Sequence, residues 1–461
     1  MNLPTPEPVI APPIRRGTLM LFALPAILQA FMLMPAGVIL QTVYARESGI
    51  ALATLGVALM VVRLLDIASD LLIGRLSDRS AQRGISRKRW MVAGTLVTVL
   101  ALWFLFRPPG QVSVWYFAFW FWLANIGWSL VEIPYRSWTI EFTPDVAQRT
   151  RIVTYVATFT FLGGLLFYSV APLGKALGLL DSAEYNLQML GLTAIVVVLF
   201  LPVLNFISFA RVPDTQLPQP QPLSSVAAPR ESWALLWKAL AGNPHLLRLF
   251  GCYAIASLAL GLGGSVSLIY MTNYLLLGSS ANTVMALSIP LTMLGIPFWG
   301  WMATRFPRQK LWSVGLALSG LAYAAMSLYP PQPNVLGFAL MVSLMVFCVL
   351  AGLVAVPVLL GDAIDYGKAT FGIECAGLYQ ACQAQAVKGL KAISGGSGLI
   401  LLGWLGFDAT KSGAELTPQA VIALKWVAAW LPGIGFLLSA ALIWLVPIGS
   451  GMQKPKPRPA R

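Results

Sequence analysis

Three acidic side chains interrupt long apolar stretches of the chain, and two of them have helical spacing. Asp66 and Asp70 lie four residues apart in one stretch, and Arg63 precedes Asp66 by three residues. Residues three and four apart stack on one side of an α-helix. Glu132 lies in a second apolar stretch. Hard cations prefer oxygen ligands, and clustered buried acids also bind protons. These residues therefore predict a site for a small cation, either Na⁺ or H⁺.

A static network of interhelical ion pairs is the alternative interpretation of these acids. A charge near the middle of a bilayer costs roughly 2.5 to 3.5 kcal/mol on insertion scales, so such groups pair or face a water-filled cavity. Structural pairing rarely needs three acids in one membrane domain, so we favour the cation site. Ser129 precedes Glu132 by three residues, and its hydroxyl oxygen could serve as a further ligand.

The composition places these acids in a membrane protein. The chain is 57% hydrophobic and 10% charged, with a mean hydropathy of +0.75, whereas a soluble domain carries about 25% charged residues. Twelve apolar stretches reach the roughly 17 to 25 residues that span a bilayer. They fall near 18–43, 49–73, 90–107, 112–140, 152–174, 187–210, 246–277, 281–303, 311–329, 335–361, 376–405 and 420–447. We predict an all-α membrane protein with twelve transmembrane helices in two six-helix bundles.

The net charge of +14 indicates topology rather than nucleic-acid binding. In the twelve-helix arrangement, 21 of the 31 Lys and Arg fall on the side of the two tails, and five fall in the opposite loops. Basic residues concentrate in cytoplasmic loops, so both termini are predicted to be cytoplasmic in a multi-pass protein of the inner membrane. Anionic membrane lipids are expected partners of this surface, and nucleic acid is not.

A polar segment separates the two predicted bundles. Residues 211–230 are rich in Pro, Gln and Ser, which is typical of an extended linker. The Trp and Leu residues that follow have helical spacing and predict a short interfacial helix. We therefore expect an N-terminal cytoplasmic tail, a first bundle, a linker, a second bundle and a basic C-terminal tail. The predicted boundaries are 1–17, 18–210, 211–245, 246–447 and 448–461.

Two loops in matching positions of the two halves resemble each other. GRLSDRSAQRGISRKRW (74–90) and GWMATRFPRQKLW (300–312) both open on Gly, place Arg five positions later, and lead into a basic cluster. Such repetition is expected of two bundles related by an axis along the membrane normal. The first copy also resembles the major facilitator superfamily signature Gly-x-x-x-Asp-Arg, here Gly74, Asp78 and Arg79. The resemblance implies that these residues belong to a cytoplasmic gate.

Three further stretches are similar to the glycoside–pentoside–hexuronide:cation symporter family of that superfamily. They are the Arg-x-x-Asp-x-x-x-Asp pattern of residues 63–70, SLVEIPYRSW (129–138) and GDAIDYGKATFGIECAGLYQACQAQAVKGL (361–390). The last resembles the family's loop after helix ten, with Asp362 and Asp365, and it continues into helix eleven. The resemblance implies that Asp66, Asp70 and Glu132 bind the cation. It also implies that Lys388 neutralises the empty site, and that Arg63, Asp362 and Asp365 act at the cytoplasmic gate.

Other positions depart from the sugar-using members of that family. Those members carry an acid on helix one, but residues 18–43 contain no charge, and Ala157 stands where an arginine is expected in helix five. We therefore expect a solute with substantial apolar surface rather than a simple sugar. The residues expected to line its cavity are Gln29, Trp128, Tyr135, Trp138 and Tyr270. Three Gly-Gly pairs, at 163–164, 263–264 and 395–396, predict close helix approach.

We predict a cation-coupled secondary transporter of a small organic solute that works by alternating access. It is expected to act as a monomer and to need no cofactor besides the coupling ion. One alternative is a carrier of an amphipathic solute, such as a lysolipid, a peptide or a drug-like compound. Another is a membrane sensor or an enzyme, but the sequence contains no His-Glu-x-x-His pair and no Gly-x-Ser-x-Gly elbow. The solute, the choice between H⁺ and Na⁺, and the direction of transport stay open.

Overall fold

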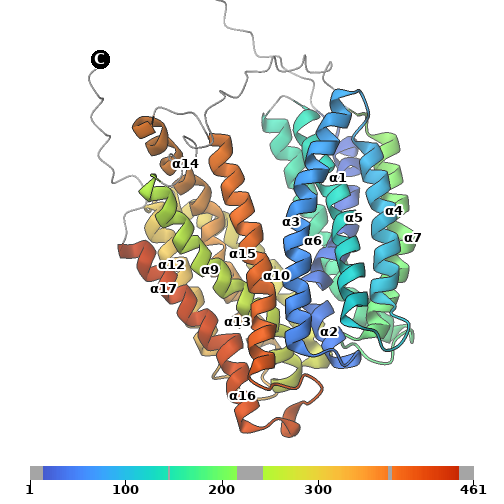
Figure 1. Cartoon of the computed structure of the whole chain (residues 1–461), viewed down its shortest axis with the longest axis vertical. Helices are drawn as coiled ribbons and strands as arrows, with labels where there is room; N and C mark the ends of the chain where they lie inside the picture. The colour runs from blue at the N-terminus through green and yellow to red at the C-terminus, as the bar shows by residue number, and fades with distance from the viewer. Residues whose placement is uncertain (1–13, 144–145, 215–241, 372–375, 446–461) are drawn as a thin grey trace, which may run out of the picture.

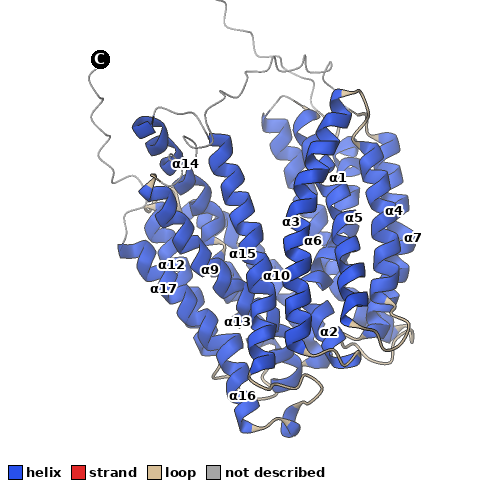
Figure 2. Ribbon diagram, viewed as in Figure 1, coloured by secondary structure: helices blue, strands red, loops and turns tan. Residues whose placement is uncertain are grey.

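The computed structural model describes residues 14–143, 146–214, 242–371 and 376–445, and every regular element within these ranges is a helix (Figure 2). This confirms the predicted all-α fold. Ten of the described helical segments are long and apolar enough to cross a membrane. The predicted interfacial helix and most of both tails lie outside the described residues.

The N-terminal bundle contains six helical rods. The first is α1 (Arg16–Met34), which continues through a π-helical turn, η1 (Pro35–Ile39), into α2 (Leu40–Glu47). The other five are α3 (Leu52–Gln82), α4 (Lys88–Phe106), α5 (Val114–Glu141), α6 (Val146–Ala176) and α7 (Leu187–Arg211). Side-chain caps begin two of them, because Ser113 accepts a hydrogen bond from the Tyr116 amide and Asn186 accepts one from the Met189 amide.

The C-terminal bundle repeats this plan with more interruptions. Its rods are α9 (Pro244–Ile269) with η2 (Tyr270–Tyr274), α10 (Ala281–Met293) with α11 (Gly295–Met302), α12 (Arg308–Met326), α13 (Val335–Val349) with α14 (Ala351–Phe371), α15 (Ala376–Trp404), and α16 (Pro418–Lys425) with η5 (Trp426–Trp430) and α17 (Leu431–Leu445). The turns η3 (Gly278–Ser280) and η4 (Gly413–Glu415) lie in its loops.

The prediction that a loop begins at residue 361, after helix ten, is wrong for residues 361–371. Asp362 and Asp365 lie in α14, which runs on to Phe371, so the segment that carries them is helical. The helix can extend because residues 361–371 contain no proline, and their two glycines lower helix propensity without breaking it.

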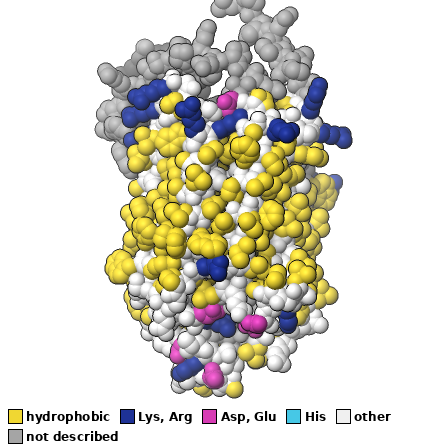
Figure 3. Space-filling view, turned by 90° about the vertical axis from the view of Figure 1, so that its right-hand side faces the viewer, with side chains coloured by type: hydrophobic (Ala, Val, Ile, Leu, Met, Phe, Trp, Pro, Cys, Tyr) yellow, Lys and Arg dark blue, Asp and Glu magenta, His cyan; other side chains and the backbone are white. Residues whose placement is uncertain are grey.

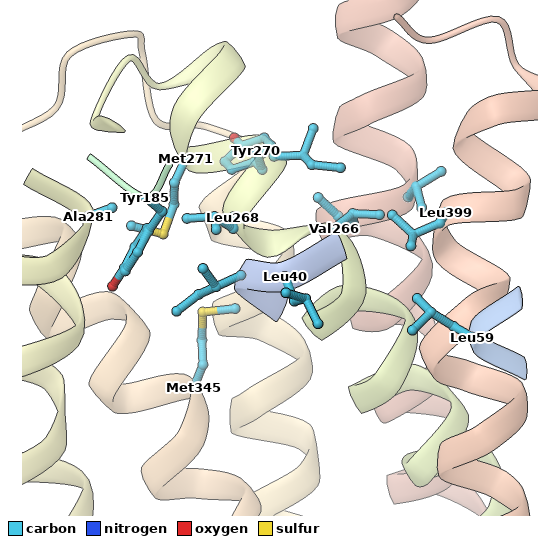
Figure 4. Packing of buried hydrophobic residues seen from close by; sticks show 14 of the residues in the cluster. Leu40, Leu59, Tyr185, Val266, Leu268, Tyr270, Met271, Ala281, Met345 and Leu399 are labelled. Carbon is cyan, nitrogen blue, oxygen red and sulfur yellow. The ribbon is translucent and has the colours of Figure 1, made fainter. Parts of the chain in front are cut away.

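The two bundles stand side by side, and their ribbons diverge toward the top of the view, where α14 ends (Figure 1). At the opposite end they share one buried core. Leu40 and Leu59 of the first bundle belong to the same cluster as Val266 and Leu399 of the second (Figure 4). Seen from the side of the first bundle, a belt of hydrophobic side chains crosses this face of the molecule, and Lys and Arg gather above it (Figure 3).

Candidate cation site and the surrounding gate

The acids of α3 lie on one face of the helix. Asp70 is 7% exposed, and Asp66, one turn earlier, is half-buried. Arg63 lies a further turn back, where its guanidinium donates to Oδ1 of Asn125 at 3.3 Å and stacks 5.3 Å from the ring centre of Phe121. The half-buried arginine therefore joins α3 to α5, one turn from Asp66.

The carboxylate of Glu132 on α5 is held at both oxygens. The indole Nε1–H of Trp128 donates to Oε2 at 2.5 Å, and Nη2 of Arg136 donates to Oε1 at 2.6 Å. Ser129 is buried one turn away. Arg136 is a contact that the sequence analysis missed, although its position four residues after Glu132 is a recognisable signal.

Helix α5 packs against α3, and α15 packs along the other side of α3. Among the described residues, however, no three His, Cys, Asp or Glu side chains are grouped as ligands of one metal ion. Lys388 lies in α15, and its side chain is outside the described residues. A cation site formed by all three acids therefore stays a prediction.

A small cavity of about 20 Å³ lies inside the N-terminal bundle. Gln29 and Trp128, both predicted cavity residues, line it together with Met32, Thr98 and Asn205. Gln29 Nε2, Thr98 Oγ1 and Asn205 Oδ1 are buried and have no hydrogen-bond partner among the described residues. The cavity is large enough for a group of about the size of water, and its polar lining is uncharged.

Tyr135 and Trp138 do not line this small cavity, and their expected role in the solute cavity stays a prediction. Both are buried in an aromatic cluster with Phe22, whose backbone carbonyl accepts a hydrogen bond from the Tyr135 hydroxyl at 2.7 Å. The Trp138 indole donates to the carbonyl of Asp214 at 2.5 Å. These contacts direct both side chains toward α1 and Asp214.

Tyr270 likewise packs inside its own bundle, and its expected role in the solute cavity stays a prediction. Its side chain is fully buried, and its hydroxyl donates to the carbonyl of Met326 at 3.0 Å. The π-helical turn at residues 270–274 changes the helical register there, so the side chain packs within the C-terminal bundle.

The C-terminal ends of α3 and α14, which carry the predicted gate residues other than Arg63, lie at the end where the bundles diverge (Figure 1). Asp78 forms an ion pair with Arg87 at 3.0 Å, and Arg87 also donates to the Ser77 hydroxyl at 3.0 Å. Gly74 lies in the same helix, with room for a Cβ, and Arg79 is exposed. On α14, Asp362 is half-buried and Asp365 is exposed.

Glycines bring α3 and α15 into backbone contact at the other end. A Cβ added to Gly396 would lie 2.3 Å from the carbonyl oxygen of Gly56, and one added to Gly56 would lie 2.7 Å from that of Gly396. The predicted close approach is thus present at Gly396, but Gly395 faces open space. Asn282 of α10 adds a hydrogen bond to the carbonyl of Ala183 at 2.7 Å. These contacts close this end of the molecule.

Comparisons with known proteins agree with this architecture. Residues 21–450 match the family described as MFS/sugar transport protein. A bacterial homologue of the human lysosomal transporter Spinster, in an inward-facing and unoccupied conformation, has a similar structure. Its TM-score is 0.65 at 17% identity, over 94% of this chain and 97% of that one.

Two other solved structures share the fold. The nucleoside transporter NupG has a TM-score of 0.62 at 14% identity, over 94% of this chain and 98% of that one. The xylose transporter XylE from E. coli, in an inward-open conformation, has a TM-score of 0.56 at 14% identity. The match covers 94% of this chain and 97% of that one. At these identities the likeness concerns the fold alone. The family match over nearly the whole chain shows that this protein belongs to the MFS/sugar transport protein family of the major facilitator superfamily, and that it is a membrane transporter rather than an enzyme.

Proposed function

We propose that the protein is a secondary active transporter of a small organic solute, driven by H⁺ or Na⁺ through alternating access. The observation that carries this proposal is the burial of Asp70 within a membrane-spanning helix, one turn from Asp66. Burying a carboxylate in a bilayer is costly, and intramembrane acids are typical of ion and proton pathways. Asp66, Asp70 and Glu132 are the proposed ligands, Ser129 adds an oxygen, and Lys388 is the proposed counter-ion of the empty site.

The distribution of charge supports a cytoplasmic placement of the tails in the inner membrane. Lys and Arg gather at the end of the first bundle where the linker begins (Figure 3), and such residues favour the cytoplasm. With this orientation, the closed end at Gly56 and Gly396 would face outward. This supports our proposal of an inward-facing state, and we propose that the protein acts as a monomer. The proposed gate of Arg63, Gly74, Asp78, Arg79, Asp362 and Asp365 then lies on the cytoplasmic side.

Topology can be tested with reporter fusions. Alkaline phosphatase and green fluorescent protein fused after residues 220 and 455 are expected to report a cytoplasmic location at both sites, because basic residues are retained on that side. A fusion after residue 181, in the loop between α6 and α7, is the matched control for the opposite side. Phosphatase activity at 220 or 455 would contradict the orientation.

The solute is proposed to have substantial apolar surface, which includes amphipathic molecules. The apolar part of the cavity lining supports this proposal, and it consists of Met32, Leu102, Trp128, Val131 and Leu201. The three polar groups without partners among the described residues, on Gln29, Thr98 and Asn205, suit the polar end of an amphipathic solute. A sugar ring needs several fixed donors and acceptors, since unpaired polar groups in a site reject a ligand strongly. Methionine and aromatic side chains form adaptable apolar surfaces instead.

Purified protein in liposomes would test the function directly. Uptake of a panel of a galactoside, a xyloside, a dipeptide, a lysophospholipid and a hydrophobic amine is measured under an imposed Na⁺ gradient, a pH gradient, or neither. We expect one gradient to drive accumulation of an apolar or amphipathic member. Equal uptake without any gradient would contradict coupling. Cation-driven accumulation of the plain galactoside would restore a sugar as the substrate.

A further inference from the structure

The carboxylate of Glu132 forms an ion pair with the guanidinium of Arg136 in this structure. Nη2 of Arg136 lies 2.6 Å from Oε1, while the other oxygen accepts the indole N–H of Trp128 at 2.5 Å. Hydrogen bonds between charged groups are shorter and roughly twice as strong as neutral ones. Both oxygens of Glu132 thus already accept a hydrogen bond. Each oxygen keeps a second lone pair, but the positive charge of Arg136 opposes the binding of a second cation at the same carboxylate.

The two donors differ in how easily they can leave. Trp128 lines the internal cavity and packs against the core of the bundle, which fixes its ring. The Arg136 side chain is 76% exposed, and that of Glu132 is 27% exposed. A long, exposed side chain loses few contacts when it swings away, so Arg136 is the donor that can be displaced.

The other arginine near the site has a different partner. Arg63 is directed to Asn125 and Phe121, while Arg136 donates to Glu132, four residues before it on the same helix. Exposed ion pairs at this spacing contribute only about 0.3 to 0.5 kcal/mol. An ion pair of that strength can open and re-form readily, so it contributes little to holding the helix together.

We propose that Arg136 is a tethered substitute for the coupling cation: its guanidinium occupies Glu132 while the site is empty, and the cation and Arg136 compete for this carboxylate. The inference rests on the proposed function, in which Glu132 is a cation ligand. The competition lowers the affinity of the site for its cation.

Arg136→Gln is the decisive variant, because it removes the competing charge and keeps a polar side chain. Binding of Na⁺ alone is measured by the shift in thermal unfolding of the full-length protein at fixed pH, and binding of protons by the same shift across a pH series. No solute is needed. We expect the cation concentration at half-effect to fall by about twofold in Arg136→Gln, since the strength of an exposed ion pair at this spacing converts to roughly that factor. Arg136→Lys should stay close to the unmodified protein.

Arg151→Gln is the matched control, because it removes an exposed positive charge from α6 of the same bundle. An equal shift in this control would overturn the proposal in favour of a general charge effect. A lower unfolding temperature for Arg136→Gln without a change in the half-effect concentration would also overturn it, since that is the result of a purely structural ion pair.

Asp66→Asn separates this inference from the proposed function. If the unmodified protein binds a cation, Asp66→Asn does not, and Arg136→Gln binds with unchanged affinity, the competition is wrong and the cation site stands. If neither Na⁺ nor H⁺ shifts the unfolding of any variant, the proposed coupling fails, and the role of Arg136 fails with it.

Discussion

Asparagine at position 66 or 70 is expected to abolish gradient-driven accumulation of the solute and to leave the protein folded in the membrane. The amide preserves the shape of the side chain and removes the charge that the cation requires. Truncating one partner of a buried charged pair costs about 2 to 5 kcal/mol, so cation affinity should fall by roughly 30-fold or more. Glu132→Gln is expected to behave similarly. Accumulation in proteoliposomes under the driving gradient is the measurement.

Two comparisons make this prediction specific. Exchange of labelled for unlabelled solute without a gradient is expected to survive in the three variants, because it requires the solute site and not the cation. Asp181→Asn removes an exposed acid from the loop before α7 and should leave accumulation unchanged. If all three variants accumulate solute as well as the unmodified protein, the acids are structural ion pairs.

Alanine at position 396 is expected to open the end of the molecule that is closed in this structure. The added Cβ would lie 2.3 Å from the carbonyl oxygen of Gly56 and 2.5 Å from Cγ of Met60. Backbone atoms cannot rotate away as a side chain can, so α3 and α15 must separate. Overpacking of this kind costs about 1 to 3 kcal/mol, which shifts a conformational equilibrium by roughly 5- to 150-fold. Transport should fall, because alternating access requires both states.

A cysteine in place of Leu59 reports this opening. Leu59 is 5% exposed in the core that joins the bundles, near Leu399 (Figure 4). With the four native cysteines replaced, a membrane-impermeant maleimide should modify it faster in Gly396→Ala than in the parent. Gly395→Ala is the matched control, because a Cβ there meets nothing within 4 Å. Equal rates in the two alanine variants would show that the glycine contact does not set the equilibrium.

The elements were accessible to prediction because their signal is local. Each predicted apolar stretch overlaps a helical rod of the structure, since a bilayer requires long apolar helices whatever their neighbours are. The exceptions are local as well. The segment with Asp362 and Asp365 was expected to be a loop from family resemblance, whereas its composition permits the helix that the structure contains.

The site was only partly predictable. Asp66 and Asp70 share a face because the helix period fixes their spacing, and the contact of Glu132 with Arg136 follows from the same rule. The placement of Tyr135, Trp138 and Tyr270 did not follow. Their burial depends on which helix packs against them and, for Tyr270, on a π-helical turn.

The sequence by itself determined the membrane class, the helical rods, the family, and the intramembrane acids, because hydropathy, charge bias and short motifs are properties of neighbouring residues. Only the tertiary structure decided which end of the molecule is closed and which glycine of the pair at 395–396 makes the contact. It also decided which aromatic side chains support the core and which border the internal cavity. Those features depend on the approach of helices far apart in the sequence, where a difference of one residue turns a side chain about 100° around the helix axis.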